Sequence, residues 1–272
     1  IAATALTVAA FTVDAALGAV MEPGSMLNSR PIFGLRWYGF GNVTFAVYAS
    51  AGLVLAGYIA HRCLAAGRRG GAIAAVGAIG FGIVICEGWP SMGSDFGGVI
   101  VLTPAVLWLM LALSGVKMTW PKLLAIGGSA VLAVSVISVL DWLRGPDQRT
   151  HLGNFVQRII DGDALDVISR KAVASAETMV APVGLGSVVI GVALWIVIFR
   201  YLVPRIATVF STLRSTLIAA LIVAILGTVL NDGGIFVWLT VTAQITVVAG
   251  WFFFDWAERN DWTPSALVAA HR

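Results

Sequence analysis

Residues 179–203 read MVAPVGLGSVVIGVALWIVIFRYLV, an apolar run in which Arg200 is the single charged side chain. A helix needs about 20 such residues to cross the hydrocarbon core of a bilayer. Apolar and polar residues do not alternate here, so the run predicts a helix and not a strand of a membrane barrel. A helix also pairs its own backbone N–H and C=O groups, which hydrocarbon requires.

Further apolar runs of similar length recur along the chain, and nearly all charges fall between them. Apolar residues make up 59% of the sequence and charged residues 11%, whereas soluble domains carry about 25% charged residues. We therefore predict an all-α fold, a polytopic transmembrane helical bundle of about eight spans that forms one integral-membrane domain over residues 1–272. The predicted spans are 1–21, 39–60, 71–88, 97–116, 122–142, 179–203, 214–231 and 233–256.

The distribution of positive charge predicts the orientation of the bundle. Cytoplasmic loops of membrane proteins are enriched in Lys and Arg. The loops 61–70, 117–122 and 204–214, taken with Arg200 and the C-terminal tail, carry most of the 17 basic residues. We therefore expect a multi-pass plasma-membrane protein with both termini of this segment in the cytoplasm. The loops expected on the extracytoplasmic side are 22–38, 87–96 and 143–178.

The extracytoplasmic loop 143–178 is the one long polar segment between predicted spans. Gly162 divides it into two expected short helices, of which the second covers 164–175. The apolar residues that recur at helical spacing in the first are Leu152, Phe155, Val156, Ile159 and Ile160. An amphipathic helix between two spans is expected to lie in the membrane interface, either packed on the bundle as a lid or gating a substrate.

Three polar clusters lie at the ends of predicted spans on the extracytoplasmic face. The first is RWYGFGN at 36–42, the second is the turn 87–98, and the third begins at Asp141. We predict that side chains from all three converge. The candidate ligand-binding residues are Arg36, Tyr38, Asn42, Glu87, Asp95, Asp141, Arg144, Arg149 and His151.

Ionisable side chains near hydrocarbon are costly and usually paired, so these clusters predict either a structural salt-bridge network or a polar pocket. In a pocket, arginines would hold a phosphate or carboxylate through bidentate hydrogen bonds. The acids Glu87, Asp95 and Asp141 would alternatively hold a divalent cation such as Mg²⁺ or Ca²⁺. We expect no resident cofactor or metal, because no Cys/His spacing indicates one. We expect no nucleic acid either, because no basic stripe carries interleaved aromatic residues.

Asp14 is the one acid well inside a predicted span, about two-thirds of the way along it. A carboxylate at that depth is a candidate proton relay, or it pairs with Arg30 or Arg36. Gln244 is a second polar side chain at membrane depth. No Ser-His-Asp order, phosphate-binding loop or HExxH motif is present, so no catalytic residue is assigned.

The three clusters together resemble a family of actinobacterial polytopic membrane proteins. Members combine an N-terminal extracytoplasmic region, similar to the alkaline phosphatase superfamily, with a C-terminal membrane region. The resemblance implies that this chain is the membrane part of a longer protein and that the catalytic residues lie in the other part. The start at Ile1, inside an apolar run, agrees with that expectation. Within about residues 10–175, the stretches that carry the resemblance are 36–42, 94–98, 141–144, 149–153 and 161–171.

These observations leave three functions open. The first is a module of the cell envelope that binds a phosphorylated lipid or polyprenyl headgroup at the outer leaflet, for an attached or partner phosphatase-like or transferase-like domain. The second is a secondary transporter or flippase that uses Asp14 and the outer polar clusters, although the internal repeats common in transporters are not evident. The third is a non-catalytic membrane anchor or assembly subunit. Membrane lipids are the expected partners.

Overall fold

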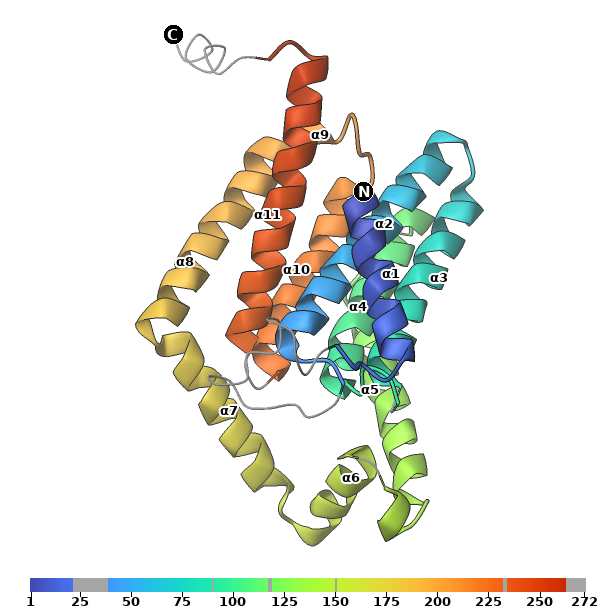
Figure 1. Ribbon diagram of the computed structural model, residues 1–272, viewed down its shortest axis with the longest axis vertical. Helices are drawn as coiled ribbons and strands as arrows, with labels where there is room; N and C mark the ends of the chain where they lie inside the picture. The colour runs from blue at the N-terminus through green and yellow to red at the C-terminus, as the bar shows by residue number, and fades with distance from the viewer. Residues whose placement is uncertain (22–38, 90, 117–118, 150, 232–233, 263–272) are drawn as a thin grey trace.

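The computed structural model describes residues 1–21, 39–89, 91–116, 119–149, 151–231 and 234–262, and within these ranges the fold is helical throughout (Figure 1). The all-α prediction is therefore confirmed. The elements are α1 (Ala2–Ala16), α2 (Asn42–Ala65), α3 (Arg69–Gly88), α4 (Phe96–Ser114), α5 (Trp120–Trp142), η2 (Pro146–Gln148), α6 (His151–Asp161), α7 (Ala164–Val180), α8 (Pro182–Val197), the π-helical turn η3 (Ile198–Leu202), α9 (Val203–Ile206), α10 (Leu213–Leu230) and α11 (Gly234–Arg259).

Six helices of the described chain are long and apolar enough to cross a membrane. They are α2, α3, α4, α10, α11 and the continuous helical stretch Pro182–Ile206 that contains α8, η3 and α9. Each coincides with a predicted span. The helix α5 matches the predicted span 122–142 in position, and α1 falls within the predicted span 1–21. The count of eight crossings therefore stays a prediction.

The first helix ends earlier than the sequence predicted. After Ala16 the chain turns, because Gly18 has a φ of +90° and Ala19 a φ of +56°. The Oδ1 atom of Asp14 accepts a hydrogen bond from the backbone N–H of Met21 at 2.9 Å. Asp14 therefore lies in the last turn of a shorter helix, and its carboxylate closes the end of that helix.

The helix α2 lies at the centre of the bundle. It contacts α1, α3, α4, α10 and α11. Figure 1 shows α10 and α11 beside α2, although they follow it at the far end of the sequence. The N-terminus and the end of α11 lie at the same end of the bundle (Figure 1), which the prediction of two termini on one face requires.

Small residues let the helices around α2 approach closely. A Cβ atom on Gly57 would lie 2.1 Å from the Thr216 Oγ1 atom of α10, and one on Gly80 would lie 2.5 Å from Val106 of α4. The Thr212 hydroxyl also donates to the Gly57 carbonyl oxygen at 2.7 Å. In contrast, Gly82 faces open space, so not every glycine in these helices has a packing role.

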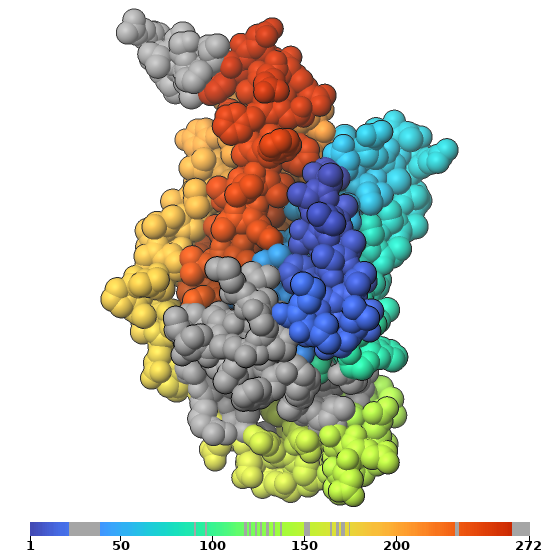
Figure 2. Space-filling model, in the orientation of Figure 1, coloured from blue at the N-terminus to red at the C-terminus, as the bar shows by residue number. Residues whose placement is uncertain are grey.

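Helices α5 to α8 form an arch along one side of the bundle (Figure 1). The arch is joined to the bundle where α5 packs on α4 and where α8 packs on α11. Residues of α5 and α6 form the end of the molecule opposite the end of α11 (Figure 2). The two helices predicted in the loop 143–178 are present, separated by Gly162 with a φ of +86°. The second extends to Val180, five residues beyond its predicted end.

Candidate functional site

Five of the predicted ligand-binding residues belong to two groups at one end of the bundle, where α3 and α5 end and α4 and α6 begin (Figure 1). We call the first the inner cluster, because it is buried at the turn from α3 to α4. The second, the corner cluster, lies where α5 meets α6. The inner cluster comprises Thr12, Tyr48, Glu87, Asp95 and Asn231. The corner cluster comprises Asp141, Trp142, Arg144, Arg149 and Gln157.

The turn between α3 and α4 holds two buried acids. Glu87 in the last turn of α3 is 0% exposed, and Asp95, which directly precedes α4, is 3% exposed. The backbone N–H of Asp95 donates to the carbonyl oxygen of Glu87 at 2.7 Å, and the N–H of Gly93 donates to that of Cys86 at 2.8 Å. These bonds fold the turn back on the end of α3 and bring the two acids into one enclosed site.

The segment that precedes α2 packs directly on this turn. The backbone N–H of Phe40 donates to the carbonyl oxygen of Gly93 at 2.7 Å. A Cβ atom on Gly39 would lie 2.2 Å from the same oxygen, and Gly39 has a φ of +73°. Both observations require glycine at position 39. At Gly39 the two backbones therefore approach each other closely.

The inner cluster also contains polar side chains that the sequence did not single out. The hydroxyls of Tyr48 in α2 and Thr12 in α1 are 2.7 Å apart, and the Cys86 thiol and Glu87 lie beside the Tyr48 hydroxyl. Thr12, Tyr48 and Cys86 are each an isolated polar group within an apolar span, which is a weak signal in a sequence. Their contacts join three helices at the buried end of the bundle.

Asn231, which follows α10, completes the inner cluster. Its Oδ1 atom and the Oδ1 atom of Asp95 both face Gly97, at 2.5 and 3.4 Å from the position of a Cβ there. Asn231 is 7% exposed, and within the described chain its Nδ2 atom has no hydrogen-bond partner. The position of Asn231 beside the α3–α4 turn depends on the packing of α10 on α4, so the sequence alone does not predict it.

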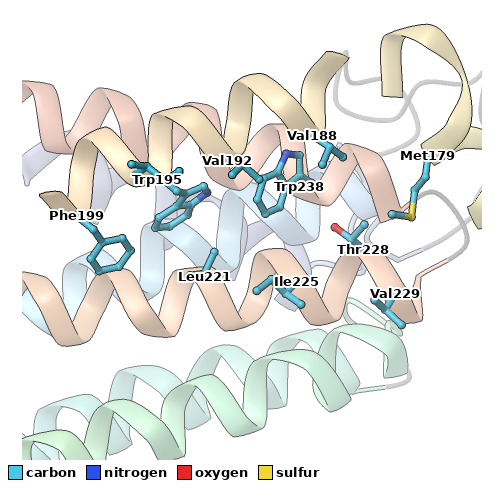
Figure 3. A pocket seen from close by; sticks show the side chains of 11 residues that line it. Met179, Val188, Val192, Trp195, Phe199, Leu221, Ile225, Thr228, Val229 and Trp238 are labelled. Carbon is cyan, nitrogen blue, oxygen red and sulfur yellow. The ribbon is translucent and has the colours of Figure 1, made fainter. Parts of the chain in front are cut away.

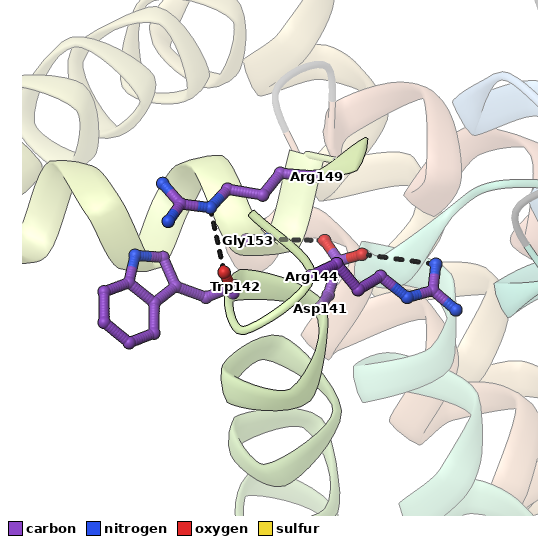
Figure 4. Close-up of polar contacts among 5 residues, drawn as sticks. All are labelled: Asp141, Trp142, Arg144, Arg149 and Gly153. Atoms are coloured by element: carbon purple, nitrogen blue, oxygen red, sulfur yellow. Dashed lines mark hydrogen bonds and ion pairs between the residues drawn. The ribbon is translucent and has the colours of Figure 1, made fainter. Parts of the chain in front are cut away.

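The corner cluster holds two arginines in different states (Figure 4). Arg149 donates from Nε to the Trp142 carbonyl oxygen and from a terminal nitrogen to Gln157 Oε1, both at 2.9 Å. Its guanidinium also lies over the Trp142 ring, 5.2 Å from the ring centroid. Arg149 is therefore fixed as a clamp between α5 and α6.

Arg144 is held far more loosely. Its side chain is 60% exposed and contacts Asp141 through an ion pair of 3.7 Å. The other carboxylate oxygen of Asp141 accepts the backbone N–H of Gly153 at 2.8 Å, at the start of α6. Asp141 thus holds the end of α5 against the start of α6. The Arg144 guanidinium beside it is exposed, so its N–H groups can donate hydrogen bonds to a ligand (Figure 4).

The remaining predicted ligand-binding residues are placed as follows. Asn42 is the first residue of α2 and is half-buried. His151 is the first residue of α6. Arg36 and Tyr38 lie outside the described residues. The structure therefore brings Glu87 together with Asp95, and Asp141 together with the two arginines of the corner.

The two polar side chains predicted at membrane depth, Asp14 and Gln244, have separate structural roles. The Asp14 carboxylate closes the end of α1. Gln244 of α11 accepts a hydrogen bond from the Ser50 hydroxyl of α2 and lines a cavity of about 320 Å³ between α1, α2 and α11. Asp14 is not among the residues that line this cavity, so the two residues do not share one path there.

No group of three His, Cys, Asp or Glu side chains is arranged to hold a metal ion in the described part of the chain. The divalent-cation alternative required Glu87, Asp95 and Asp141 to meet, and Asp141 instead belongs to the corner cluster. Comparison with known protein families, with curated proteins and with solved structures finds no match for this chain.

Proposed function

We propose that this chain is a membrane-embedded module of the cell envelope that binds a phosphorylated lipid at the corner between α5 and α6. In this proposal α1 and α5 also cross the membrane, the termini are cytoplasmic, and α6 and α7 lie in the interface of the outer leaflet. The observation that carries the proposal is the contrast in the corner cluster between the clamped Arg149 and the exposed Arg144.

The corner offers a positive group on a rigid support. Arg149, Trp142 and Gln157 are mutually hydrogen-bonded, because Gln157 Oε1 also accepts the Trp142 indole N–H at 2.9 Å. Arg144 lies two residues beyond Trp142 and carries a planar set of donors that suits phosphate oxygens. Burial excludes a headgroup from Glu87 and Asp95, so we assign contact with the ligand to Arg144 and a structural role to the inner cluster.

The surroundings of the corner suit a lipid ligand. Ile159 and Ile160 of α6 are 54% and 58% exposed, and Leu165 of α7 is 76% exposed. Exposed aliphatic side chains on an amphipathic helix are stable when they lie in the boundary between headgroups and acyl chains. A lipid phosphate at that depth would meet the Arg144 guanidinium.

We further propose that the bound lipid serves an extracytoplasmic domain, in the same full-length protein or in a partner. The resemblance of residues 10–175 to actinobacterial membrane proteins with a phosphatase-like region is the basis of this part of the proposal. In such an arrangement the module holds the lipid headgroup, and the chemistry takes place elsewhere. We assign no catalytic residue to this chain.

The proposal is tested by measuring how the purified protein binds phosphatidic acid in detergent, by native mass spectrometry. A charge-assisted hydrogen bond contributes about 1.5–3 kcal/mol, so we expect Arg144→Ala to weaken binding about tenfold or more. Arg158→Ala is the matched control, because Arg158 is an exposed arginine of α6 outside the corner. Arg36→Ala tests whether the predicted residue shares the site.

Equal binding by wild type and Arg144→Ala would refute the headgroup site. Equal weakening by Arg144→Ala and Arg158→Ala would show a diffuse electrostatic attraction and would also refute it. If all variants bind no lipid phosphate, the chain is better explained as an anchor or assembly subunit.

A further inference from the structure

A long apolar groove lies between α8, α10 and α11, on the inner side of the arch (Figure 3). Its volume is about 540 Å³, within the range of about 300–1,000 Å³ that is usual for ligand pockets. Figure 3 shows side chains of α8 and α10 facing each other across it, with two indole rings between them. The groove is separate from both polar clusters.

Polar atoms in the walls of the groove are bonded within the protein. The Trp195 indole N–H donates to the Thr242 hydroxyl at 3.1 Å, and the Trp238 indole N–H donates to the Ser187 carbonyl oxygen at 3.1 Å. The Thr228 hydroxyl donates to the Ala224 carbonyl oxygen at 2.6 Å. The groove therefore presents an apolar surface to its occupant. A sugar or a phosphate bound there would lose its hydrogen bonds to water without gaining others from the protein.

The groove continues the membrane-facing surface of α8. Val189 and Ile190 on the same helix are 69% and 63% exposed, as expected for a helix that faces lipid. Ile196 lines the groove and is itself 59% exposed, so the groove opens sideways toward the same hydrocarbon. A bilayer chain reaches it without passing through water.

The length and position of the groove indicate which chain it holds. From Val188 to Phe199 the lining of α8 extends about 16 Å, at about 1.5 Å per residue. This is close to half of a hydrocarbon core of about 30 Å, the depth that one acyl chain of one leaflet occupies. The lining begins at Met179 at the end of α7, the end of the bundle where the arch lies. A polyprenyl chain is far longer than this lining.

We propose that the groove between α8, α10 and α11 binds one acyl chain of a membrane phospholipid, taken from the leaflet in which α7 lies. This site is independent of the headgroup site at the corner, because none of its lining residues belongs to the corner cluster. A lipid bound in the groove would stay with the protein, whereas lipids on the outer surface of the bundle exchange freely with the bilayer.

The test uses a phosphatidylglycerol probe with a photoreactive diazirine in one acyl chain, added to the full chain in phosphatidylcholine vesicles. We expect adducts on residues that line the groove, such as Val188, Trp195 and Leu221. Val192→Trp fills the groove and should reduce these adducts at least fivefold. Val189→Trp adds the same bulk to the lipid-facing side of α8 and should leave them unchanged.

Ile225→Trp fills the groove from α10 and guards against misfolding of a single variant, with monodispersity in gel filtration as the check on folding. Labelling of both groove-filling variants at the level of the wild type, or adducts concentrated on the lipid-facing Val189 and Ile190, would overturn the proposal. Displacement of the probe by a polyprenol but not by unlabelled phosphatidylglycerol would overturn the choice of an acyl chain. Arg144→Ala should leave the labelling unchanged, which separates this result from that of the headgroup test.

Discussion

At the scale of the residue, glycines mark the places where two backbones meet. Gly39 combines a positive φ with a close approach to the Gly93 carbonyl oxygen. Gly67, in the connection between α2 and α3, has a similar φ of +71°, and a Cβ atom added there would have nothing within 4 Å. The two positions therefore separate the effect of backbone conformation from that of the contact.

We predict that Gly39→Ala lowers the free energy of unfolding by about 3 kcal/mol or more. A left-handed conformation costs an L residue about 1–2 kcal/mol, and overpacking adds about 1–3 kcal/mol. Gly67→Ala should cost only the first amount. Thermal unfolding of both variants in the same detergent provides the measurement, and equal losses would show that the contact with Gly93 contributes nothing.

The residue scale is also where prediction from the sequence was least complete. Arg149 was predicted as a ligand-binding residue, yet three of its interactions are with Trp142 and Gln157. Spacing in the sequence brings arginines and acids to one end of the bundle, but it does not show which of them the fold uses for itself. Asn231 was not predicted as part of a polar cluster, because its neighbours belong to α4, which is far away in the chain.

At the scale of the element, lengths and ends follow from local chemistry. The apolar runs located the membrane helices because hydrocarbon demands about 20 apolar residues in succession. The end of α1 was misplaced, because the run continues through Val20 while the turn depends on Gly18 and the Asp14 carboxylate. The helix α6 was predicted from the helical spacing of its apolar residues, a pattern that does not need tertiary contacts.

The contact between α3 and α4 offers a prediction at this scale. Gly80→Ala should destabilise the protein by about 1–3 kcal/mol, because the added methyl would overlap Val106 in a packed interface. Gly82→Ala, on the same helix, faces open space and should be neutral or stabilising by up to about 1 kcal/mol, since Ala favours the helix. Unfolding midpoints of the two variants test this, and a destabilising Gly82→Ala would contradict the assignment of the α3 faces.

At the scale of the whole molecule, the orientation in the membrane is the main untested prediction. The bundle places α6 at one end and the connection between α2 and α3 at the other (Figure 1). The sequence predicts the orientation from charge alone, because the positive-inside rule acts during insertion and leaves no mark on the packing of the helices.

Accessible cysteines test the orientation. In a Cys63→Ser background, Asn154→Cys in α6 should react with a membrane-impermeant maleimide in intact cells. Arg68→Cys, at the other end of the bundle, should react only after permeabilisation. Both positions are exposed, and Cys86 is buried, so the background is low. The reverse pattern of labelling would place the arch in the cytoplasm and remove the outer-leaflet site.

The hydrogen bond between Ser50 and Gln244 joins residues 194 positions apart in the chain. Synthesis runs from the N-terminus, so α2 is inserted long before its partners α10 and α11 leave the ribosome. Until then, the faces of α2 that will meet them are covered by lipid or by a helper protein. Assembly of this bundle is therefore completed only after α11 has been synthesised, and a nascent chain halted before α10 lacks two of the five helices that surround its central helix.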